Sequence, residues 1–173
     1  MLTLERISPE NVAAFKATRL SALQDFPTAF GSTYAKEVKL SDADWCQRAI
    51  DWSNQRSTGY LAMEEGTPCG IGAAFLDAKD PEKAHLVSMW VAPAQRGKGV
   101  GLALVSAIRS WAKDHGARTL RLSVTNNNDQ AIGFYRRIGF SMTGNTEPYP
   151  NDPALFEYEM SQNLAVENKG SSR

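Results

Sequence analysis

The stretch QRGKGVGLALV, residues 95–105, combines features that suit the binding of an anion. Glycines recur at Gly97, Gly99 and Gly101, where the lack of a side chain lets the backbone come close to a ligand. An apolar pattern typical of a helix begins at Val100, and the N-terminus of a helix offers unpaired N–H groups to anions. The stretch therefore predicts a phosphate-binding turn at the start of a helix.

Two other phosphate-binding motifs do not fit this spacing. The loop of nucleoside triphosphatases needs a Gly-Lys pair followed by Ser or Thr, whereas Gly97 and Lys98 are followed by Gly99. A dinucleotide fingerprint needs a third glycine three residues after the second, and from Gly101 that position is Leu104. The acidic residue expected at the end of the next strand is also missing. The spacing therefore argues against ATP, NAD and flavin nucleotides as ligands.

The order R-x-x-G-x-G remains, formed by Arg96, Gly99 and Gly101. A second pattern, N-x-x-A-x-x-(apolar)-Y-x-x-x-G-F, follows in NDQAIGFYRRIGF, where it is matched by Asn128, Ala131, Phe134, Tyr135, Gly139 and Phe140. With both motifs in this order, residues 86–140 resemble the GNAT N-acetyltransferase superfamily, whose pyrophosphate-binding motif has the first form. The resemblance implies a single-domain acyl-CoA N-acyltransferase fold with acetyl-CoA as cosubstrate.

The resemblance also assigns the coenzyme contacts. Backbone amides from Gly97 to Leu102 would hold the pyrophosphate, with the positive end of the helix behind them. The backbone of the preceding strand would pair with the pantetheine arm and polarise the thioester carbonyl, and Asn128, also a helix cap by pattern, would contact that arm. Arg96 and Lys98 are open to two interpretations, phosphate contacts or solvated loop cations. The implied contacts are Met89, Trp90, Val91, Arg96, Gly97, Lys98, Gly99, Val100, Gly101, Leu102, Asn128 and Tyr135.

Tyr135 is also the candidate general acid. Transfer of an acetyl group to an amine requires a group that protonates the departing thiolate. By its pattern, on a helix face with Ala131, Ile132 and Ile138, a tyrosine is typically a core residue. Only the match to the second motif assigns Tyr135 to catalysis.

The general base is not evident. Several relatives carry a glutamate on a central strand, but the strands here read LVSMWV and LRLSV, with Ser88 and Ser123 as their small polar residues. A serine has no basicity near neutral pH, so these hydroxyls could at most order water, which favours an acceptor amine of low pKa. The remaining candidates are Glu37, Glu157 and Glu159, although a solvated or structural role is the simpler interpretation of each. The two histidines form no group with other ligands, and we expect no metal.

Alternating strands and helices must position these residues. Proline after Ser8, and the pair Ser41 and Asp44, are typical of helix starts, and Gly116 is typical of a helix end. The nearly continuous apolar run at 86–91 predicts a central strand. The expected fold class is α+β, a central, mostly antiparallel mixed sheet flanked by helices. Strands are expected at 2–7, 60–63, 69–76, 86–91, 120–124 and 156–160, and helices at 8–23, 41–52, 100–115 and 128–139.

The bulk composition predicts one domain, residues 1–163, followed by a disordered polar tail, residues 164–173. The 19 basic and 19 acidic residues balance, so no global field favours nucleic acid or an anionic membrane. No apolar run approaches the length needed to cross a bilayer, and the first residues lack the pattern of a signal peptide. Cys46 and Cys69 read as inert thiols. We therefore expect a cytoplasmic protein; the resemblance allows a homodimer, but the sequence does not determine the oligomeric state.

The acceptor site is expected at two loops, residues 26–37 and 146–156, which correspond to the acceptor-binding segments of the family. Phe30, Tyr34 and Tyr149 could wall a small pocket, and Glu37 could attract a cationic amine, although ordinary loop packing is the simpler interpretation of each. No strongly acidic surface is signalled, so the first choice is a small-molecule amine. The alternatives are a protein N-terminus or lysine as acceptor, a non-catalytic acyl-CoA sensor, and a nucleotide-binding regulatory module.

Overall fold

A computed structural model gives the structure of the protein and describes residues 1–164. One seven-stranded sheet forms its centre, in the order β1-β2-β3-β4-β5-β7-β6, and only β4 and β5 pair in parallel. The α+β class, the mostly antiparallel sheet and the central place of β4 are therefore confirmed. The strands are β1 (Leu2–Arg6), β2 (Ser57–Glu64), β3 (Thr67–Leu76), β4 (Lys83–Val91), β5 (Thr119–Thr125), β6 (Ser141–Pro148) and β7 (Phe156–Asn163).

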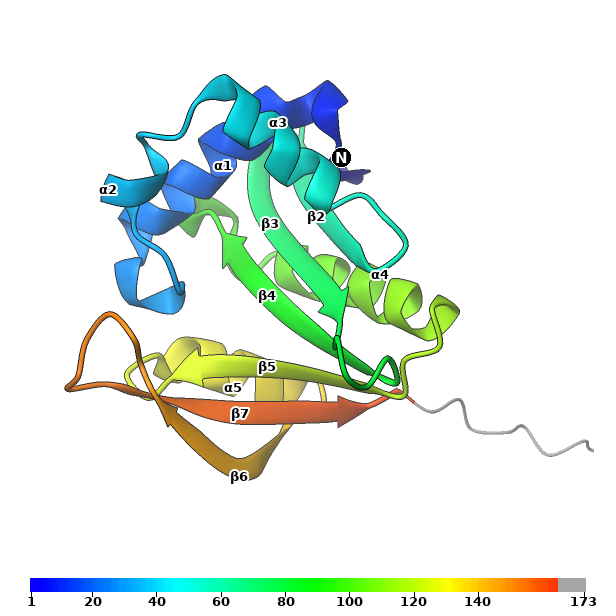
Figure 1. The fold of residues 1–173 in the computed structure, drawn as a ribbon, viewed down its shortest axis with the longest axis vertical. Helices are drawn as coiled ribbons and strands as arrows, with labels where there is room; N and C mark the ends of the chain where they lie inside the picture. The colour runs from blue at the N-terminus through cyan, green and yellow to red at the C-terminus, as the bar shows by residue number, and fades with distance from the viewer. Residues whose placement is uncertain (165–173) are drawn as a thin grey trace, which may run out of the picture.

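Two groups of helices cover opposite faces of this sheet (Figure 1). The first group packs on one face of β2–β4, where Phe15 and Trp45 meet Leu61 and Ile71. The second group packs on the other face and reaches across β3, β4, β5 and β7. The first group consists of α1 (Val12–Asp25), α2 (Tyr34–Glu37) and α3 (Asp42–Asp51), and the second of α4 (Val100–Asp114) and α5 (Asp129–Arg137). Short 3₁₀ turns lie at Pro9–Asn11, Pro27–Ala29 and Pro93–Gln95.

The helix ends follow local sequence chemistry. Ser41 and Asp44 form a capping box at the start of α3, which satisfies N–H groups that the helix leaves unpaired. The Asn128 side chain accepts a hydrogen bond from the backbone N–H of Ala131 at the start of α5. Beyond the end of α4, Gly116 adopts the left-handed conformation with φ of 86°. These three expectations from the sequence are confirmed.

The parallel strands β4 and β5 separate along their length (Figure 1). Only Lys83–His85 of β4 pair with β5, where their partners are Thr119–Arg121. Past that point the facing backbone edge of β4 has no partner in β5, and β4 is irregular at Ser88, whose φ is 59°. A non-glycine residue in this region is uncommon and is held there by its surroundings. The sheet thus opens on the side toward which both β4 and β5 run.

Three details differ from the sequence-based expectations. Strand β6 was not expected, because seven of its eight residues are exposed and show no apolar alternation. Leu164, placed in the expected tail, is 3% exposed and packs in the core, since an apolar side chain next to β7 can reach it. Residues 165–173, the rest of that expected tail, lie outside the described residues. Among residues 1–164, no helix has the length and apolarity that a bilayer span requires.

Candidate functional site

A cavity of about 290 Å³ lies where β4, the glycine loop, α4 and α5 meet. Of the coenzyme contacts that the resemblance implied, Lys98 is exposed and does not line this cavity. Phe134, Gln130 and Arg137 of α5 line it as well, and the sequence patterns did not assign coenzyme contacts to them. The expected coenzyme contacts that do line the cavity are Met89, Trp90, Val91, Arg96, Gly97, Gly99, Val100, Gly101, Leu102, Asn128 and Tyr135.

The glycine loop presents free backbone donors to this cavity. Gly97 and Gly99 have φ values of 77° and 85°, which place the chain in a left-handed turn directly before α4. Among the described residues, no turn, loop or cap hydrogen bond uses the N–H groups of residues 97–102. At Gly101 a Cβ atom would lie 3.0 Å from the ring of Phe134, so the glycine permits α4 and α5 to approach closely here. The loop therefore has the geometry and the donors that an anionic phosphate group requires.

Arg96 is tied to the strand that precedes it. Its Nε donates a hydrogen bond to the Val91 carbonyl at 2.9 Å, and its Nη2 donates to the Asp25 carboxylate at the end of α1. Asp25 also accepts a hydrogen bond from the Trp90 indole at 2.9 Å. The hydrogen bond from Trp90, followed by that from Arg96, holds the pKa of Asp25 below its ordinary value despite some burial. Arg96 thus joins α1, β4 and the loop, and Asp25 is a partner that no sequence motif marked.

Tyr135 lies between the core and the cavity. Its side chain is 8% exposed, its ring contacts Phe134 and Phe140, and it lines the same cavity as Met89 and Gly99. Burial raises the pKa of the phenol, because the charged form loses solvation. No hydrogen bond from a described residue engages the hydroxyl group. Tyr135 is therefore a protonated and uncommitted donor at the cavity.

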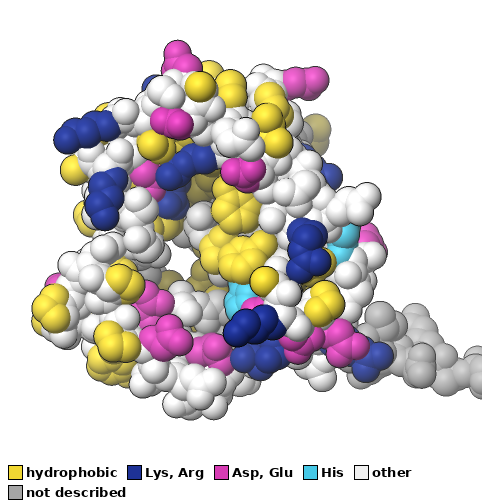
Figure 2. Space-filling view, in the orientation of Figure 1, with side chains coloured by type: hydrophobic (Ala, Val, Ile, Leu, Met, Phe, Trp, Pro, Cys, Tyr) yellow, Lys and Arg dark blue, Asp and Glu magenta, His cyan; other side chains and the backbone are white. Residues whose placement is uncertain are grey.

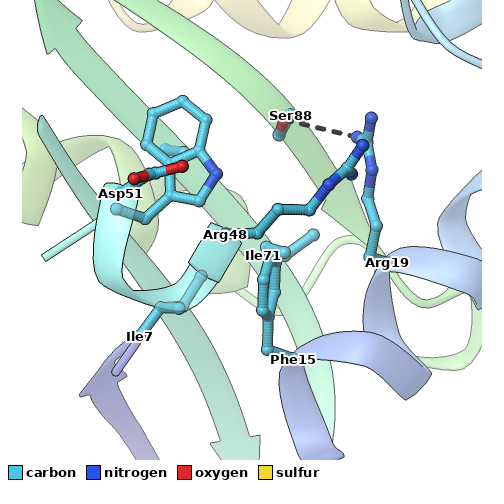
Figure 3. A pocket seen from close by; sticks show the side chains of 9 residues that line it. Ile7, Phe15, Arg19, Arg48, Asp51, Ile71 and Ser88 are labelled. Carbon is cyan, nitrogen blue, oxygen red and sulfur yellow. Dashed lines mark hydrogen bonds between the residues drawn. The ribbon is translucent and has the colours of Figure 1, made fainter. Parts of the chain in front are cut away.

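A second cavity, of about 330 Å³, lies between the α1–α3 group and β3–β4 (Figure 3). Ser88 of β4 lines this second cavity, while the next residue, Met89, lines the first. The two cavities therefore meet β4 at its irregular point. The residues that line the second cavity are Ile7, Phe15, Arg19, Arg48, Asp51, Trp52, Ile71, Ala73 and Ser88.

Glu37 holds two arginines of this second cavity. Its buried carboxylate accepts hydrogen bonds from Arg19 Nε at 3.0 Å and Nη2 at 3.1 Å, and from Arg48 Nη1 at 2.7 Å. Burial alone would raise the pKa of Glu37, but the hydrogen bonds and charge of Arg19, with Ser32 and Arg48, hold it below its ordinary value. Glu37 does not line the cavity. The sequence suggested that it attracts an amine directly, whereas the structure shows that its charge is already paired.

The expected aromatic wall is mostly packing within the loop at 26–37. Phe30 and Tyr149 are 4% and 3% exposed, and the Tyr149 hydroxyl donates a hydrogen bond to the Phe30 carbonyl at 2.6 Å. Tyr34 is partly buried against the same cluster, and none of the three lines either cavity. Arg19 and Arg48 line the second cavity instead, and no sequence pattern indicated this. Their link to Glu37 spans different helices, so no local spacing indicated it.

The open side of the sheet carries carboxylates on β7. Glu157 lies opposite Thr125 of β5 and Glu147 of β6. Burial, and then repulsion from Glu147, raise the pKa of Glu157, although a hydrogen bond with Ser123 opposes the shift. Figure 2 shows a row of acidic side chains on the β5–β7 side of the central hollow, and both basic and acidic side chains on the side of α1–α3. Glu157 is therefore a carboxyl group whose basicity is shifted toward neutral pH.

Glu159, two residues further along β7, is already engaged. Its carboxylate accepts hydrogen bonds from Thr143 at 2.9 Å and from Asn145 at 3.1 Å, and Arg121 lies at 3.4 Å. The two glutamates, which the sequence left equivalent, thus differ in their surroundings.

The histidines and cysteines lie apart from both cavities. His85 forms a hydrogen bond with Asp77 at 2.8 Å, and His115 Nδ1 lies 2.8 Å from the Trp111 carbonyl at the end of α4. In the described part of the chain no group of three or more His, Cys, Asp and Glu side chains is arranged to hold a metal ion. Cys46 and Cys69 are both free thiols.

Comparison with known proteins gives consistent results. The model of the Acetyltransferase (GNAT) family matches residues 19–140. The streptothricin acetyltransferase of Streptomyces lavendulae is 48% identical over 120 residues, which are 69% of this chain and 57% of that protein. The peptidyl-lysine N-acetyltransferase YjaB of Salmonella typhimurium is 35% identical over 147 residues, which are 82% of this chain and 86% of that protein.

Solved structures agree in fold. YncA of Salmonella typhimurium superimposes with a TM-score of 0.79 at 16% identity, over 100% of this chain and 99% of that one. The chain spans about half of the length of several curated relatives that it matches, between 46% and 57% of theirs. The family model nevertheless covers most of the chain, including both sequence motifs and the first cavity. The chain belongs to the GNAT acetyltransferase family.

Proposed function

We propose that the protein transfers the acetyl group of acetyl-CoA to a primary amine of a small-molecule acceptor, by direct attack in a ternary complex. The observation that carries this proposal is the meeting of two cavities at one irregular point of β4. The first presents unpaired amides and a protonated phenol, and the second is a compact pocket on the opposite side of the strand. Two substrates bound in these cavities would meet beside Ser88 and Met89.

The residues of the first cavity fit coenzyme A. The free amides of residues 97–102 would hold the pyrophosphate, and the unpaired edge of β4 at Met89–Val91 would bind the pantetheine arm. The YncA structure is described with its cofactor acetyl-CoA, which supports this assignment by fold. Arg96 would act mainly by holding the loop against Val91, and Lys98 is left to solvent.

The chemistry requires two proton transfers. The acceptor must lose a proton before its nitrogen can attack the carbonyl carbon of the thioester. As the C–N bond forms and the C–S bond breaks, the departing sulfur must gain a proton. Tyr135 is the proposed donor for the sulfur, because its phenol is protonated and lines the coenzyme cavity.

Glu157 is the proposed acceptor of the amine proton. Ser123 lies on the stretch of β5 that has separated from β4, close enough to Glu157 to lower its pKa. Water ordered by this hydroxyl can pass a proton from the opening between the strands to the carboxylate. The raised pKa brings Glu157 closer to that of the amine, which makes the transfer more favourable.

Replacing Glu157 by Gln is expected to lower kcat about tenfold near neutral pH. The loss is smaller than is typical of a general base, because solvent can also accept the proton of an amine of low pKa. In the wild-type protein kcat should fall as the pH decreases through the raised pKa of Glu157, above 4.5, since the carboxylate must be ionised to act. Glu157→Gln should remove this acidic limb. Glu159→Gln, which alters an engaged carboxylate on the same strand, is the matched control; an equal loss there would contradict the assignment.

Two relatives define the alternatives for the acceptor. By their names, the streptothricin acetyltransferase acts on streptothricin and YjaB on peptidyl lysine. The compact second cavity favours a small molecule, while the similarity to YjaB over most of both chains keeps a lysine side chain as the second candidate. A protein that uses acetyl-CoA together with free thiols fits the cytoplasm, which we propose as its location.

The first test compares ligands by thermal shift and then amines by thiol release. Acetyl-CoA at 100 times its Kd should raise the free energy of unfolding by about 2.7 kcal/mol, while ATP and NADH should not. Thiol release with small primary amines then tests turnover. A shift without turnover by any amine would favour the sensor function, and preferential stabilisation by ATP or NADH would overturn the proposal.

The same assay tests the glycine loop. In Gly99→Ala a Cβ atom is forced into the left-handed region, at a cost of about 1–2 kcal/mol. We expect the strained loop to relax from this geometry, so that the affinity for acetyl-CoA falls about tenfold. Gly66→Ala places the same strain in the β2–β3 turn, at φ of 78°, and should leave the affinity unchanged. Equal affinities in the two variants would contradict a dependence of coenzyme binding on the left-handed turn at Gly99.

A further inference from the structure

We propose that the second cavity binds a carboxylate group of the acceptor through Arg19 and Arg48, and that the acceptor is an amino acid with an apolar side chain. This inference rests on the proposed function and names the substrate class for the acceptor pocket. It is carried by the juxtaposition of two arginines on the cavity wall with one buried carboxylate behind them.

The charge of the cavity wall is positive on the side nearest β4. The Glu37 side chain is 1% exposed and does not line the cavity, whereas both arginines that it pairs with do. One carboxylate therefore compensates two guanidinium groups from behind, and on this side of the pocket an excess positive charge faces inward. Figure 3 shows Arg19 and Arg48 converging near Ser88, with Asp51 on the other side of the pocket. Asp51 accepts a hydrogen bond from Gln47 at 2.9 Å.

The arginines retain donors for a ligand. A guanidinium group has five N–H donors. Arg48 uses one of them for Glu37, and Arg19 uses three, for the two oxygens of Glu37 and for Ser88 Oγ at 3.3 Å. Arg19 also lies over the Phe30 ring and Arg48 over the Trp45 ring, and these contacts restrict the movement of both groups. Two oriented guanidinium groups with spare donors are suited to a carboxylate, which can accept several hydrogen bonds at once.

The position of Arg19 relates this anion site to the reaction. Its hydrogen bond to Ser88 places one guanidinium group beside the irregular point of β4, where the two cavities meet. An acceptor held there by its carboxylate would carry its amine close to the opening between β4 and β5. Carboxylate and amine must then be separated by few bonds, as in an amino acid.

Apart from Asp51 and Ser88, the remaining wall is apolar and sets the preference for the side chain. It is formed by Ile7, Phe15, Trp52, Ile71 and Ala73. A diamine or another purely cationic acceptor would place its second positive charge near the two arginines. These would repel it, because that side of the pocket has no free carboxylate. The cavity therefore suits an anionic head group and an apolar side chain.

A pair of product-like ligands tests this inference without turnover. N-acetyl-L-phenylalanine and N-acetyl-L-phenylalaninamide differ at the carboxylate and carry no amine, so the pKa of an amine does not affect the comparison. With the protein saturated with free CoA, calorimetry should show the acid binding at least tenfold more tightly than the amide. Equal binding within threefold, tighter binding of the amide, or no binding of either compound would overturn the inference.

Variants test whether the preference for the acid depends on Arg48. Arg48→Gln should weaken binding of the acid about tenfold and leave binding of the amide unchanged. The affinity of Arg48→Lys for the acid should lie between those of the wild-type protein and Arg48→Gln, because a lysine keeps the charge but not the planar pair of donors. Arg118→Gln, which removes an exposed cation outside the pocket, is the control. An unchanged preference for the acid in Arg48→Gln would contradict the site. If the acid binds as expected but no amine is acetylated, the carboxylate site stands and the proposed transferase activity fails.

Discussion

Glu37→Gln is expected to lower the free energy of unfolding by about 3 kcal/mol, because Glu37 is a buried partner of two arginines. The carboxylate compensates Arg19, whose side chain is 12% exposed, and Arg48, which is 37% exposed. A glutamine of similar size removes the charge and leaves two guanidinium groups facing one another. Removal of one partner from a buried ion pair typically costs about 3–5 kcal/mol, and the partial exposure of Arg48 places this case at the lower end.

Urea denaturation at several pH values measures this effect. Because the pKa of Glu37 is lowered in the folded protein, its contribution is fully present above its ordinary pKa of 4.5 and is lost as the pH falls below that value. The difference between the wild-type protein and the variant should therefore persist at neutral pH and shrink on acidification. Glu82→Gln, which breaks an exposed pair with Arg118, should cost no more than about 0.5 kcal/mol. A loss below 1 kcal/mol for Glu37→Gln would show that the two arginines do not depend on it.

The proposed coenzyme site could be predicted from the sequence because its signals are local. Gly97 and Gly99 mark left-handed backbone because other residues pay for that conformation, and Asn128 marks a helix start because its side chain can accept the N–H of Ala131. Each of these signals depends on residues a few positions apart. The parts of the fold that such signals govern, the start of α4 and the start of α5, were predicted correctly.

The proposed acceptor site could not be predicted from the sequence, because it depends on charge pairing between distant residues. Arg19, Glu37 and Arg48 come from three helices, and only the packing of those helices on β3 and β4 brings their charges together. A glutamate in an aromatic loop and two arginines on helices each resemble solvated surface residues when taken singly. Asp25 shows the same limit, since its partners Trp90 and Arg96 lie 65 and 71 positions away.

The different surroundings of similar groups separate catalytic from structural candidates. Glu157 and Glu159 lie on one strand. The carboxylate of Glu159 accepts hydrogen bonds from Thr143 and Asn145, whereas burial and a neighbouring like charge raise the pKa of Glu157. Tyrosines differ in the same way. The Tyr149 hydroxyl is bonded to the Phe30 carbonyl, whereas no described residue engages that of Tyr135.

Replacing Tyr135 by Phe is expected to lower kcat by about a hundredfold or more, the range typical of a lost general acid. The affinity for acetyl-CoA should change by less than threefold, because the ring and its contacts with Phe134 and Phe140 remain. Stability should also be retained, since the hydroxyl has no partner among the described residues. Single-turnover acetyl transfer, measured beside binding and thermal unfolding, separates these effects.

The pH dependence makes the assignment of Tyr135 specific. Because burial raises the pKa of the phenol above its ordinary value of 10, it stays protonated and should cause no decline of kcat in the wild-type protein up to that pH. The deficit of Tyr135→Phe should accordingly be constant between neutral pH and pH 10. Tyr60→Phe, a partly buried tyrosine of β2 outside both cavities, is the control and should keep full activity. If Tyr135→Phe retains the wild-type kcat across this range, the departing thiolate receives its proton from another source, and Tyr135 serves only to pack α5 against the coenzyme cavity.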